Sequence, residues 1–257
     1  MKKFIALVMA LVMMASCFAG CTSTANDSDL AYIQQKGKLI VGITDYAPMD
    51  YKDENGEWTG FDAEFARLFA AELGVEVEFV EIDWDNKVFE VQSGAIDCVW
   101  NGMTITEDRL LEVDFSISYA NGVQAIIVPE NSPITCADDL YAEGANYKVG
   151  VQLGTTGDIY ATGDFGGDNV TTYSNGNEAV LALLGGSVDC VIIDNEPAKA
   201  LVAANAGLKI LDTAYANEDY AICVKKGNAD LLGKIDAAIM ELTEDGTIAA
   251  IVAKYIK

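Results

Sequence analysis

The chain has 257 residues, 51% of them hydrophobic, and its 40 acidic against 16 basic residues give a formal net charge of −24. Proteins bind nucleic-acid phosphates through lysine and arginine, so this charge argues against a nucleic-acid partner. The sequence contains no histidine. This absence excludes Ser-His-Asp and Cys-His catalysis and histidine-rich metal sites.

The first 20 residues are typical of a secretory signal: Lys2 and Lys3 precede an apolar run, 4–14, that is shorter than the roughly 20 apolar residues of a membrane span. Residues 18–21, Phe-Ala-Gly-Cys, resemble a bacterial lipobox, in which Cys21 is acylated and becomes the mature N-terminus. An ordinary signal peptide with an incidental cysteine is the alternative. We expect residues 21–29 to form a tether that holds the protein on the outer face of the cell membrane.

Removing residues 1–20 leaves 237 of the 257 residues and, because it takes away two lysines and no acid, a net charge of −26. Cys98, Cys136, Cys190 and Cys223 follow Cys21. Three of the four lie in apolar, strand-like runs, where a cysteine behaves as a small hydrophobe. No CxxC spacing occurs, which argues against a zinc or redox site. One disulfide is compatible with an extracytoplasmic chain, but the sequence does not pair the cysteines.

The first half of the chain predicts a β-α-β-α-β unit. Its apolar periodicity and turn residues indicate strands at 38–44, 75–82 and 96–100, a hairpin turn at 53–56, and helices at 62–73 and 86–93. We expect Asp62 to cap the first helix, Gly74 to end it and Arg67 to face solvent. This order of elements implies a parallel sheet with right-handed crossovers.

The second half repeats the plan. We expect strands at 147–151, 170–173, 188–193 and 208–211, helices after 157, at 178–184 and at 197–205, then a strand at 221–224 and helices at 230–242 and 247–255. The last three elements are expected to return to the first unit. The prediction is therefore two doubly wound, Rossmann-like α/β lobes. Lobe 1 covers 30–122 and 220–257, lobe 2 covers 126–216, and the hinge segments lie near 121–126 and 217–221.

A short internal echo points to a ligand site. Gly94-Ala-Ile-Asp-Cys-Val reappears as Gly186-Ser-Val-Asp-Cys-Val, each time leading into a strand end. In open α/β sheets, ligands bind beyond the carboxyl ends of the strands. Two such units facing each other would place Arg109, which follows the first strand, across a cleft from Asp194, which ends the second.

This pair of charges fits an α-amino acid, which carries both a carboxylate and an ammonium group. Arginine presents a rigid fork that matches a carboxylate bidentately. The alternatives are structural. Arg109 would be a surface residue paired with an acid on its own helix (Glu107, Asp108 or Glu112), and Asp194 would cap the helix ahead of Pro197.

Several motifs together resemble the extracytoplasmic amino-acid-binding proteins of ABC importers, the family-3 solute-binding type with a type II periplasmic-binding-protein fold. The resemblance covers nearly the whole mature chain. The motifs are Val41-Gly42 with Tyr46-Ala47-Pro48, Gly60-Phe61-Asp62, Gly94-x-x-Asp97, Gly102-Met-Thr-Ile-Thr-x-x-Arg109, Val113-Asp114-Phe115-Ser116, Gly150-Val151 with Gly154-Thr-Thr, and Asp245-Gly246-Thr247.

The resemblance implies roles for individual residues. Arg109, Thr104 (through its backbone N–H and hydroxyl) and Thr156 would bind the ligand carboxylate, whereas Asp194 and the Gly102 carbonyl would bind its ammonium group. The side-chain pocket would contain Tyr46, Trp84, Asn101, Gln152, Asp45 and Thr155. Structural alternatives are a helix cap for Thr155 and Thr156, a turn for Gly102, and packing roles for Tyr46 and Trp84. Most relatives have an Asp a few residues before the Tyr46 aromatic, but this segment is one residue shorter, so Asp45 either substitutes for that Asp or points elsewhere.

The resemblance implies a monomeric binding protein, not an enzyme, that captures a polar L-amino acid and delivers it to an ABC permease without cofactor or metal. Two other functions fit the same fold. One is a cleft enzyme like cyclohexadienyl dehydratase, with Glu196 or a carboxylate near Trp84 as general acid. The other is a sensory ligand-binding module.

Overall fold

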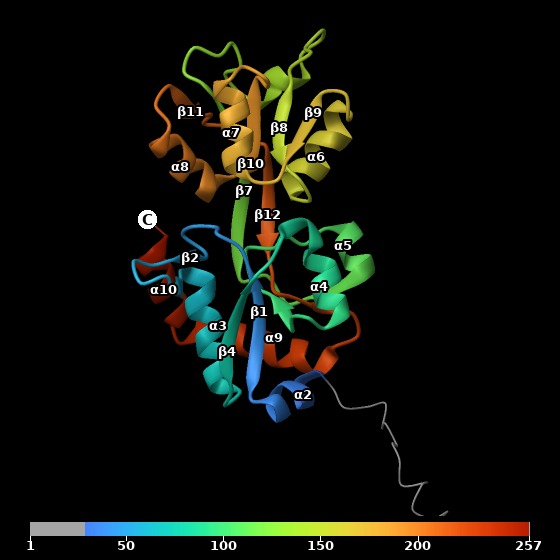
Figure 1. Ribbon diagram of the computed structural model, residues 1–257, viewed down its shortest axis with the longest axis vertical. Helices are drawn as coiled ribbons and strands as arrows, with labels where there is room; N and C mark the ends of the chain where they lie inside the picture. The colour runs from blue at the N-terminus through green and yellow to red at the C-terminus, as the bar shows by residue number, and fades with distance from the viewer. Residues whose placement is uncertain (1–28, 257) are drawn as a thin grey trace, which may run out of the picture.

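The computed structural model describes residues 29–256. The molecule is elongated and consists of two lobes, and the strands β7 (Ala120–Pro129) and β12 (Ala216–Tyr220) run between them (Figure 1). This arrangement confirms the predicted α/β fold class. The predicted signal peptide, Cys21 and all but the last residue of the predicted tether lie outside the described residues. Among residues 29–256, no helix has the length and apolar character needed to cross a bilayer.

The first lobe is built on a five-stranded sheet with the order β4-β1-β5-β13-β6. Strand β1 pairs in parallel with β4 and β5, and β13 pairs antiparallel with β5 and β6. Its elements are α2 (Asp29–Lys36), β1 (Lys38–Ile43), the β2–β3 hairpin (Tyr51–Lys52 and Trp58–Thr59), α3 (Phe61–Glu72), β4 (Glu76–Glu81), a 3-10 turn η1 (Trp84–Asn86), α4 (Lys87–Ser93), β5 (Cys98–Val99), α5 (Glu107–Glu112), β6 (Val113–Phe115), β13 (Cys223–Lys225), α9 (Ala229–Glu244) and α10 (Thr247–Tyr255).

The core of this lobe centres on α3. Phe61, Phe65 and Phe69, spaced four residues apart, are fully buried, and the ring of Phe65 contacts Trp100 edge-on at 4.8 Å between centroids. Leu68 is 37% exposed and does not belong to this face. Arg67 is half-buried rather than solvent-facing, because its guanidinium donates to the Trp58 carbonyl at 2.5 Å.

The prediction that Asp62 caps α3 is wrong. The helix begins at Phe61, and the N-cap residue, Gly60, has no side chain to form a capping bond. The carboxylate of Asp62 is instead buried and accepts hydrogen bonds from the Gly102 N–H at 2.7 Å and the Tyr119 hydroxyl at 2.9 Å. Asp62 therefore positions the chain that follows β5.

The second lobe is built on a sheet with the order β11-β7-β10-β8-β9. Strand β8 pairs in parallel with β10 and β9, whereas β7 is antiparallel to β10, β11 and β12. Besides β7 and β12, its elements are a 3-10 turn η2 (Ala137–Tyr141), β8 (Val149–Gln152), α6 (Thr156–Phe165), β9 (Val170–Tyr173), α7 (Gly176–Leu184), β10 (Cys190–Asp194), α8 (Asn195–Ala204) and β11 (Leu208–Ile210).

Both faces of this sheet are covered, as expected for a doubly wound lobe. Along β10, Val191 and Ile193 pack against α7 and α8, whereas the alternating residues Cys190 and Ile192 pack toward α6 and η2. In the described part of the chain, Cys98, Cys136, Cys190 and Cys223 are all free thiols.

The internal echo has a structural explanation. Asp97 and Asp189 occupy equivalent positions, and each exchanges hydrogen bonds with the start of the neighbouring strand. The Asp97 carboxylate accepts from the Ile40 N–H at 2.7 Å, and the Asp189 carboxylate accepts from the Lys148 N–H at 2.7 Å. The repeated motif therefore fixes the register of a parallel strand pair in each lobe, and the ligand site lies at the opposite end of those strands.

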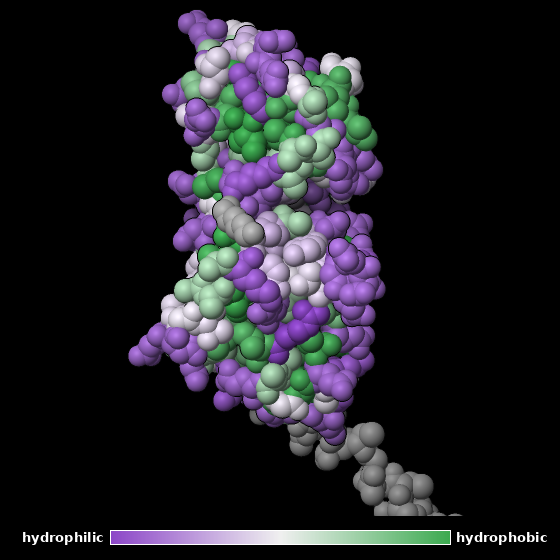
Figure 2. All heavy atoms as spheres, turned by 90° about the vertical axis from the view of Figure 1, so that its left-hand side faces the viewer, coloured by the Kyte–Doolittle hydropathy of each residue, from purple (hydrophilic) through white to green (hydrophobic). Residues whose placement is uncertain are grey.

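The connection between the lobes is a two-stranded ribbon. Residues Ala120 to Gln124 of β7 pair antiparallel with Ala216 to Tyr220 of β12. The predicted hinge segments fall in or next to this ribbon, and the predicted bending of these segments stays a prediction, as do the lobe boundaries. On the face drawn in the space-filling view (Figure 2), many hydrophilic side chains lie near the waist where the lobes meet, and a hydrophobic area lies on the second lobe, which is the upper lobe in Figure 1 and Figure 2.

Candidate functional site

A cavity of about 380 Å³ lies between the lobes. Segments just beyond the carboxyl ends of β1, β4, β5, β8, β9 and β10 all contribute to it, as expected for an open α/β sheet. It is lined by Thr44, Asp45, Tyr46, Ala47, Trp84, Asn101, Gly102, Thr104, Arg109, Gln152, Thr155, Thr156, Asn175, Gly176, Asn177, Ile193, Asp194, Pro197, Ala200, Leu201 and Ala204. Every ligand-binding residue predicted from the sequence is among them.

Arg109 enters the cavity from the first lobe, which is the lower lobe in Figure 1. Thr106 caps α5 by accepting a hydrogen bond from the Arg109 N–H, and the Arg109 side chain is only 7% exposed. Its guanidinium donates to the Thr104 carbonyl at 2.8 Å and, across the cleft, to the Gly154 carbonyl at 3.1 Å. Arg109 forms no ion pair with any acid among the described residues, so the alternative of a surface pair on α5 is wrong.

Asp194 enters from the upper lobe, at the end of β10. It occupies the N-cap position of α8 but makes no capping hydrogen bond. Its carboxyl group accepts from the Tyr220 hydroxyl at 2.9 Å and the Gln124 amide at 3.0 Å. Burial raises the pKa of Asp194 well above its usual value, and the nearby carboxylate of Glu218 raises it further. A cation in the cavity would offset both effects.

Gly102 lies beside the aromatic wall of the cavity. Its φ of +55° is in the left-handed region, and a Cβ at this position would lie 2.5 Å from Tyr46 Cε1. Glycine is therefore required for the Tyr46 ring to pack on the backbone. The Tyr46 hydroxyl is 2.9 Å from that of Tyr220, which in turn donates to Asp194.

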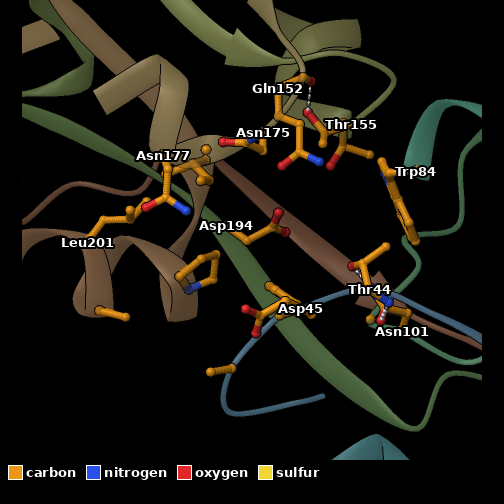
Figure 3. Close-up of a pocket in the computed structure, with 18 of the residues that line it drawn as sticks. Thr44, Asp45, Trp84, Asn101, Gln152, Thr155, Asn175, Asn177, Asp194 and Leu201 are labelled. Atoms are coloured by element: carbon orange, nitrogen blue, oxygen red, sulfur yellow. Dashed lines mark hydrogen bonds between the residues drawn. The ribbon is translucent and has the colours of Figure 1, made fainter. Parts of the chain in front are cut away.

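Other predicted residues line different sides of the cavity, with Asp45 beside Asp194 and with Gln152, Thr155 and Trp84 farther from it (Figure 3). Asn101 holds Thr44, donating to its hydroxyl at 2.9 Å and accepting from its N–H at 2.7 Å. Thr155 is the N-cap of α6 and accepts from the Asp158 N–H, so the helix-cap interpretation holds for Thr155. Asp45, Trp84 and Gln152 have side chains at the cavity surface.

Sequence reasoning missed several residues of the site. Asn175 and Asn177, at the start of α7, and Leu201 of α8 form the far wall of the cavity (Figure 3). These residues belong to none of the recognised motifs. Asn175 could have been identified because it follows the carboxyl end of β9, where ligands bind in open α/β sheets. Glu218 and Gln124, in the strands between the lobes, contact the site residues from behind the cavity.

The lobes touch each other beside the cavity. Lys87 of α4 is 4% exposed, and its ammonium group donates to the Gly154 carbonyl of the upper lobe at 2.8 Å. The same carbonyl accepts from Arg109. Burial, followed by the neighbouring Arg109 charge, lowers the pKa of Lys87 to about 7.

The carboxylates suggested for an enzymatic role lie elsewhere. Glu196 does not line the cavity, and its carboxylate pairs with Lys199 at 2.7 Å. Asp83, near Trp84, caps the η1 turn by accepting from the Asp85 N–H. Among the described residues, the acids that line the cavity are Asp45 and Asp194, and no group of three or more potential ligands could hold a metal ion.

Comparison with known proteins identifies the family. The chain is 33% identical to the L-cystine-binding protein TcyJ of Escherichia coli K12, covering 96% of this chain and 92% of TcyJ. It is 31% identical to the ABC transporter glutamine-binding protein GlnH of Bacillus subtilis 168, covering 100% and 98%. The structure of an ancestral arginine-binding protein bound to arginine matches with a TM-score of 0.77 at 42% identity, covering 86% and 99%. Because residues 39–257 also match the family model, the chain belongs to the bacterial extracellular solute-binding proteins, family 3.

Proposed function

We propose that this protein binds a free L-amino acid between its lobes outside the cytoplasm and delivers it to an ABC importer. The observation that carries the proposal is that Arg109 and Asp194 line one cavity from opposite lobes. The ligand carboxylate would bind Arg109 with the N–H groups of Thr104 and Thr156, and its ammonium group would bind Asp194 and the Gly102 carbonyl.

The charges of the cavity indicate the class of ligand side chain. Among residues 29–256, Arg109 is the only cation that lines it, and our proposal assigns Arg109 to the α-carboxylate. An acidic ligand side chain would find no second cation and would approach Asp45. We therefore expect a neutral polar or cationic side chain, which agrees with relatives named for cystine, glutamine and arginine.

Binding would proceed by closure of the lobes. A ligand that bonds to both lobes shifts the population toward the closed conformation. Each charge-assisted hydrogen bond that replaces water in the closed cleft contributes about 1.5–3 kcal/mol. The β7–β12 ribbon is the proposed hinge.

We also propose that the protein acts as a monomer anchored through a lipid on Cys21. The support is the lipobox resemblance, and Cys21 lies outside the described residues. Labelling with a fatty-acid analogue tests the anchor, because Cys21→Ala should abolish the label. Retention of the label in that variant would exclude Cys21 as the site of lipid attachment. Size-exclusion chromatography tests the monomeric state, because a dimer would elute at twice the mass of the chain.

A thermal-shift screen of the standard amino acids with cystine and ornithine tests the function. At a ligand concentration about 100-fold above Kd, binding stabilises the folded state by about 2.7 kcal/mol, which raises the unfolding midpoint visibly. No shift with any compound would contradict an amino-acid ligand. Turnover of prephenate or arogenate would instead support the enzymatic alternative.

Substitution of Arg109 tests the assigned site. We expect Arg109→Ala to weaken binding by about 30-fold or more, since removing one partner of a buried charge pair costs about 2–5 kcal/mol. Arg109→Lys should also weaken binding severely, because an ammonium group lacks the fork geometry. Arg67 is the only other arginine and lies outside the cavity, so Arg67→Lys is the matched control and should bind like wild type in calorimetry. Wild-type affinity in the Arg109 variants would remove Arg109 from the site.

A further inference from the structure

Glu218 is a buried carboxylate in the strand that connects the lobes. Its side chain is 4% exposed and does not line the ligand cavity. It forms no salt bridge among residues 29–256. Burying a carboxylate is costly unless hydrogen-bond donors satisfy it. Three donors do so here: the hydroxyls of Thr104 (3.0 Å) and Thr156, and the amide of Gln124 (2.9 Å).

The two threonines come from different lobes. Thr104 follows β5 in the lower lobe, whereas Thr156 is the first residue of α6 in the upper lobe, and both line the cavity. Their hydroxyls donate to the same oxygen of Glu218, Oε1. This single carboxylate oxygen therefore links the lobes directly behind the cavity, at the level of the proposed hinge.

These bonds limit what the threonines can offer a ligand. A hydroxyl group has one proton, and both protons point to Glu218. The backbone N–H groups of Thr104 and Thr156 have no acceptor in the described part of the chain. Thr104 lies opposite Tyr220 as a pair without mutual hydrogen bonds, because the flanking bonds run from Ile105 to Asp219 and from Ala221 to Met103. The Thr156 N–H is one of the free donors at the start of a helix.

We propose that Glu218 is a positioning residue of the amino-acid site, which fixes Thr104 and Thr156 through their hydroxyls so that their backbone N–H groups face the ligand carboxylate together with Arg109. This inference rests on the proposed function. It changes the role expected for the Thr104 hydroxyl, which bonds to Glu218 instead of to the ligand.

Gln124 extends the network to the other end of the ligand. Its amide nitrogen lies 2.9 Å from Glu218 Oε2, 3.2 Å from the Thr156 hydroxyl and 3.0 Å from Asp194. Gln124 belongs to β7 and Glu218 to β12, so the two strands of the ribbon jointly hold the carboxylate-binding and the ammonium-binding residues. The relative position of the two half-sites is therefore set at the ribbon.

A double-mutant cycle measured by calorimetry tests the proposal, with the amino acid that gives the largest thermal shift as ligand. We expect Glu218→Gln to weaken binding about tenfold or more, because the neutral amide keeps one acceptor oxygen for the threonine hydroxyls but presents an N–H donor to the Gln124 amide, which is itself a donor. Thr156→Val, which keeps the shape and removes the hydroxyl, should also weaken binding. If the two residues act through one hydrogen bond, the double variant should bind clearly better than the product of the two losses predicts.

The neighbouring acid provides the control. Asp219 lies on the same strand, is exposed and bonds to Asn121, so Asp219→Asn makes the same charge change outside the network and should bind like wild type. Should Glu218→Gln fail to fold, Glu218→Asp replaces it, since it keeps the charge but shortens the reach to the threonines.

The outcomes separate this inference from the proposed function. If the wild type binds no amino acid, the proposed function fails. If the wild type binds but the losses from Glu218 and Thr156 multiply independently, or the Glu218 variant binds like Asp219→Asn, only the positioning role of Glu218 is overturned.

Discussion

The carboxyl group of Asp194 lies in an environment that disfavours its charge until a cation arrives. Burial raises its pKa, and the Glu218 carboxylate raises it further through its charge and a side-chain hydrogen bond; the two groups that donate to Asp194, Tyr220 and Gln124, are neutral. A ligand ammonium group would lower that pKa, because an opposite charge favours the ionised form. Binding would then be coupled to the release of a proton from Asp194.

This coupling predicts a pH dependence of ligand affinity. Below the raised pKa of the empty protein, Asp194 must lose a proton before it binds an ammonium group, so affinity should fall as the pH falls. The slope approaches about tenfold per pH unit, and the fall should begin above the ordinary Asp value of about 3.9. Calorimetry between about pH 8 and pH 5, in buffers of different ionisation enthalpy, measures both affinity and proton release.

The variant Asp194→Asn separates this effect from other titrating groups. It should bind more weakly than wild type and lose the proton release. Equal proton release in the variant and the wild type would assign the pH dependence to a different group.

Single residues of the site were predictable where a recognisable motif ties them to a strand. Gly102 and Arg109 follow β5, and Asp194 is the last residue of β10. Glu218 could not be found this way, because nothing local distinguishes it from its exposed neighbour Asp219. Only the tertiary contact with Thr104 and Thr156 reveals its role. The position of Asp62 at the start of a helical pattern suits a capping residue as well as a buried acceptor, so the sequence does not distinguish the two roles.

At the scale of elements, the start of α6 brings the upper lobe against the lower one. Gly154 precedes this helix, and its carbonyl accepts from both Lys87 and Arg109. Its φ of +72° is in the left-handed region, and a Cβ here would lie 2.9 Å from Asp85 Oδ1 across the cleft. The glycine therefore permits both the turn and the close approach of the lobes.

Replacing Gly154 should obstruct closure. We expect Gly154→Ala to lower the free energy of unfolding by about 1–2 kcal/mol, the cost of an L-residue in the left-handed region, and also to weaken ligand binding. Gly74 offers a matched control: its φ is +71° and no heavy atom lies within 4 Å of the position of its Cβ. Gly74→Ala should cost similar stability and leave affinity unchanged. Denaturant unfolding and calorimetry measure the two quantities, and equal affinities for the two variants would contradict an obstructed closure.

Helices and strands with a clear period were predictable, whereas the ten-residue strand β7 and the short polar elements were not. The buried face of α3 repeats every four residues, and β10 alternates between two covered faces. In contrast, β12 reads Ala-Asn-Glu-Asp-Tyr and α5 has only six residues, so neither shows a clear period. Pairing with β7 makes β12 a strand, and this contact is not visible in its own sequence.

For the whole molecule, the central feature is that two lobes contribute opposite charges to one cavity. The sequence predicted this arrangement because each half carries a β-α-β pattern that ends in a charged residue. It did not predict the interlobe contacts of Lys87 and Glu218, since these depend on the relative placement of the lobes. The ribbon of β7 and β12 connects the lobes (Figure 1), and its residues Gln124 and Glu218 bond to Asp194, Thr104 and Thr156 of the cavity. We therefore expect closure and ligand binding to involve the same residues.

A crystal structure with the amino acid that gives the largest thermal shift tests the central claim most directly. We predict one ligand molecule between the lobes, with a carboxylate oxygen within about 3 Å of the Arg109 guanidinium and the ammonium nitrogen within about 3 Å of the Asp194 carboxylate. A ligand that contacts only one lobe, or whose carboxylate and ammonium groups bind other residues, would contradict the account.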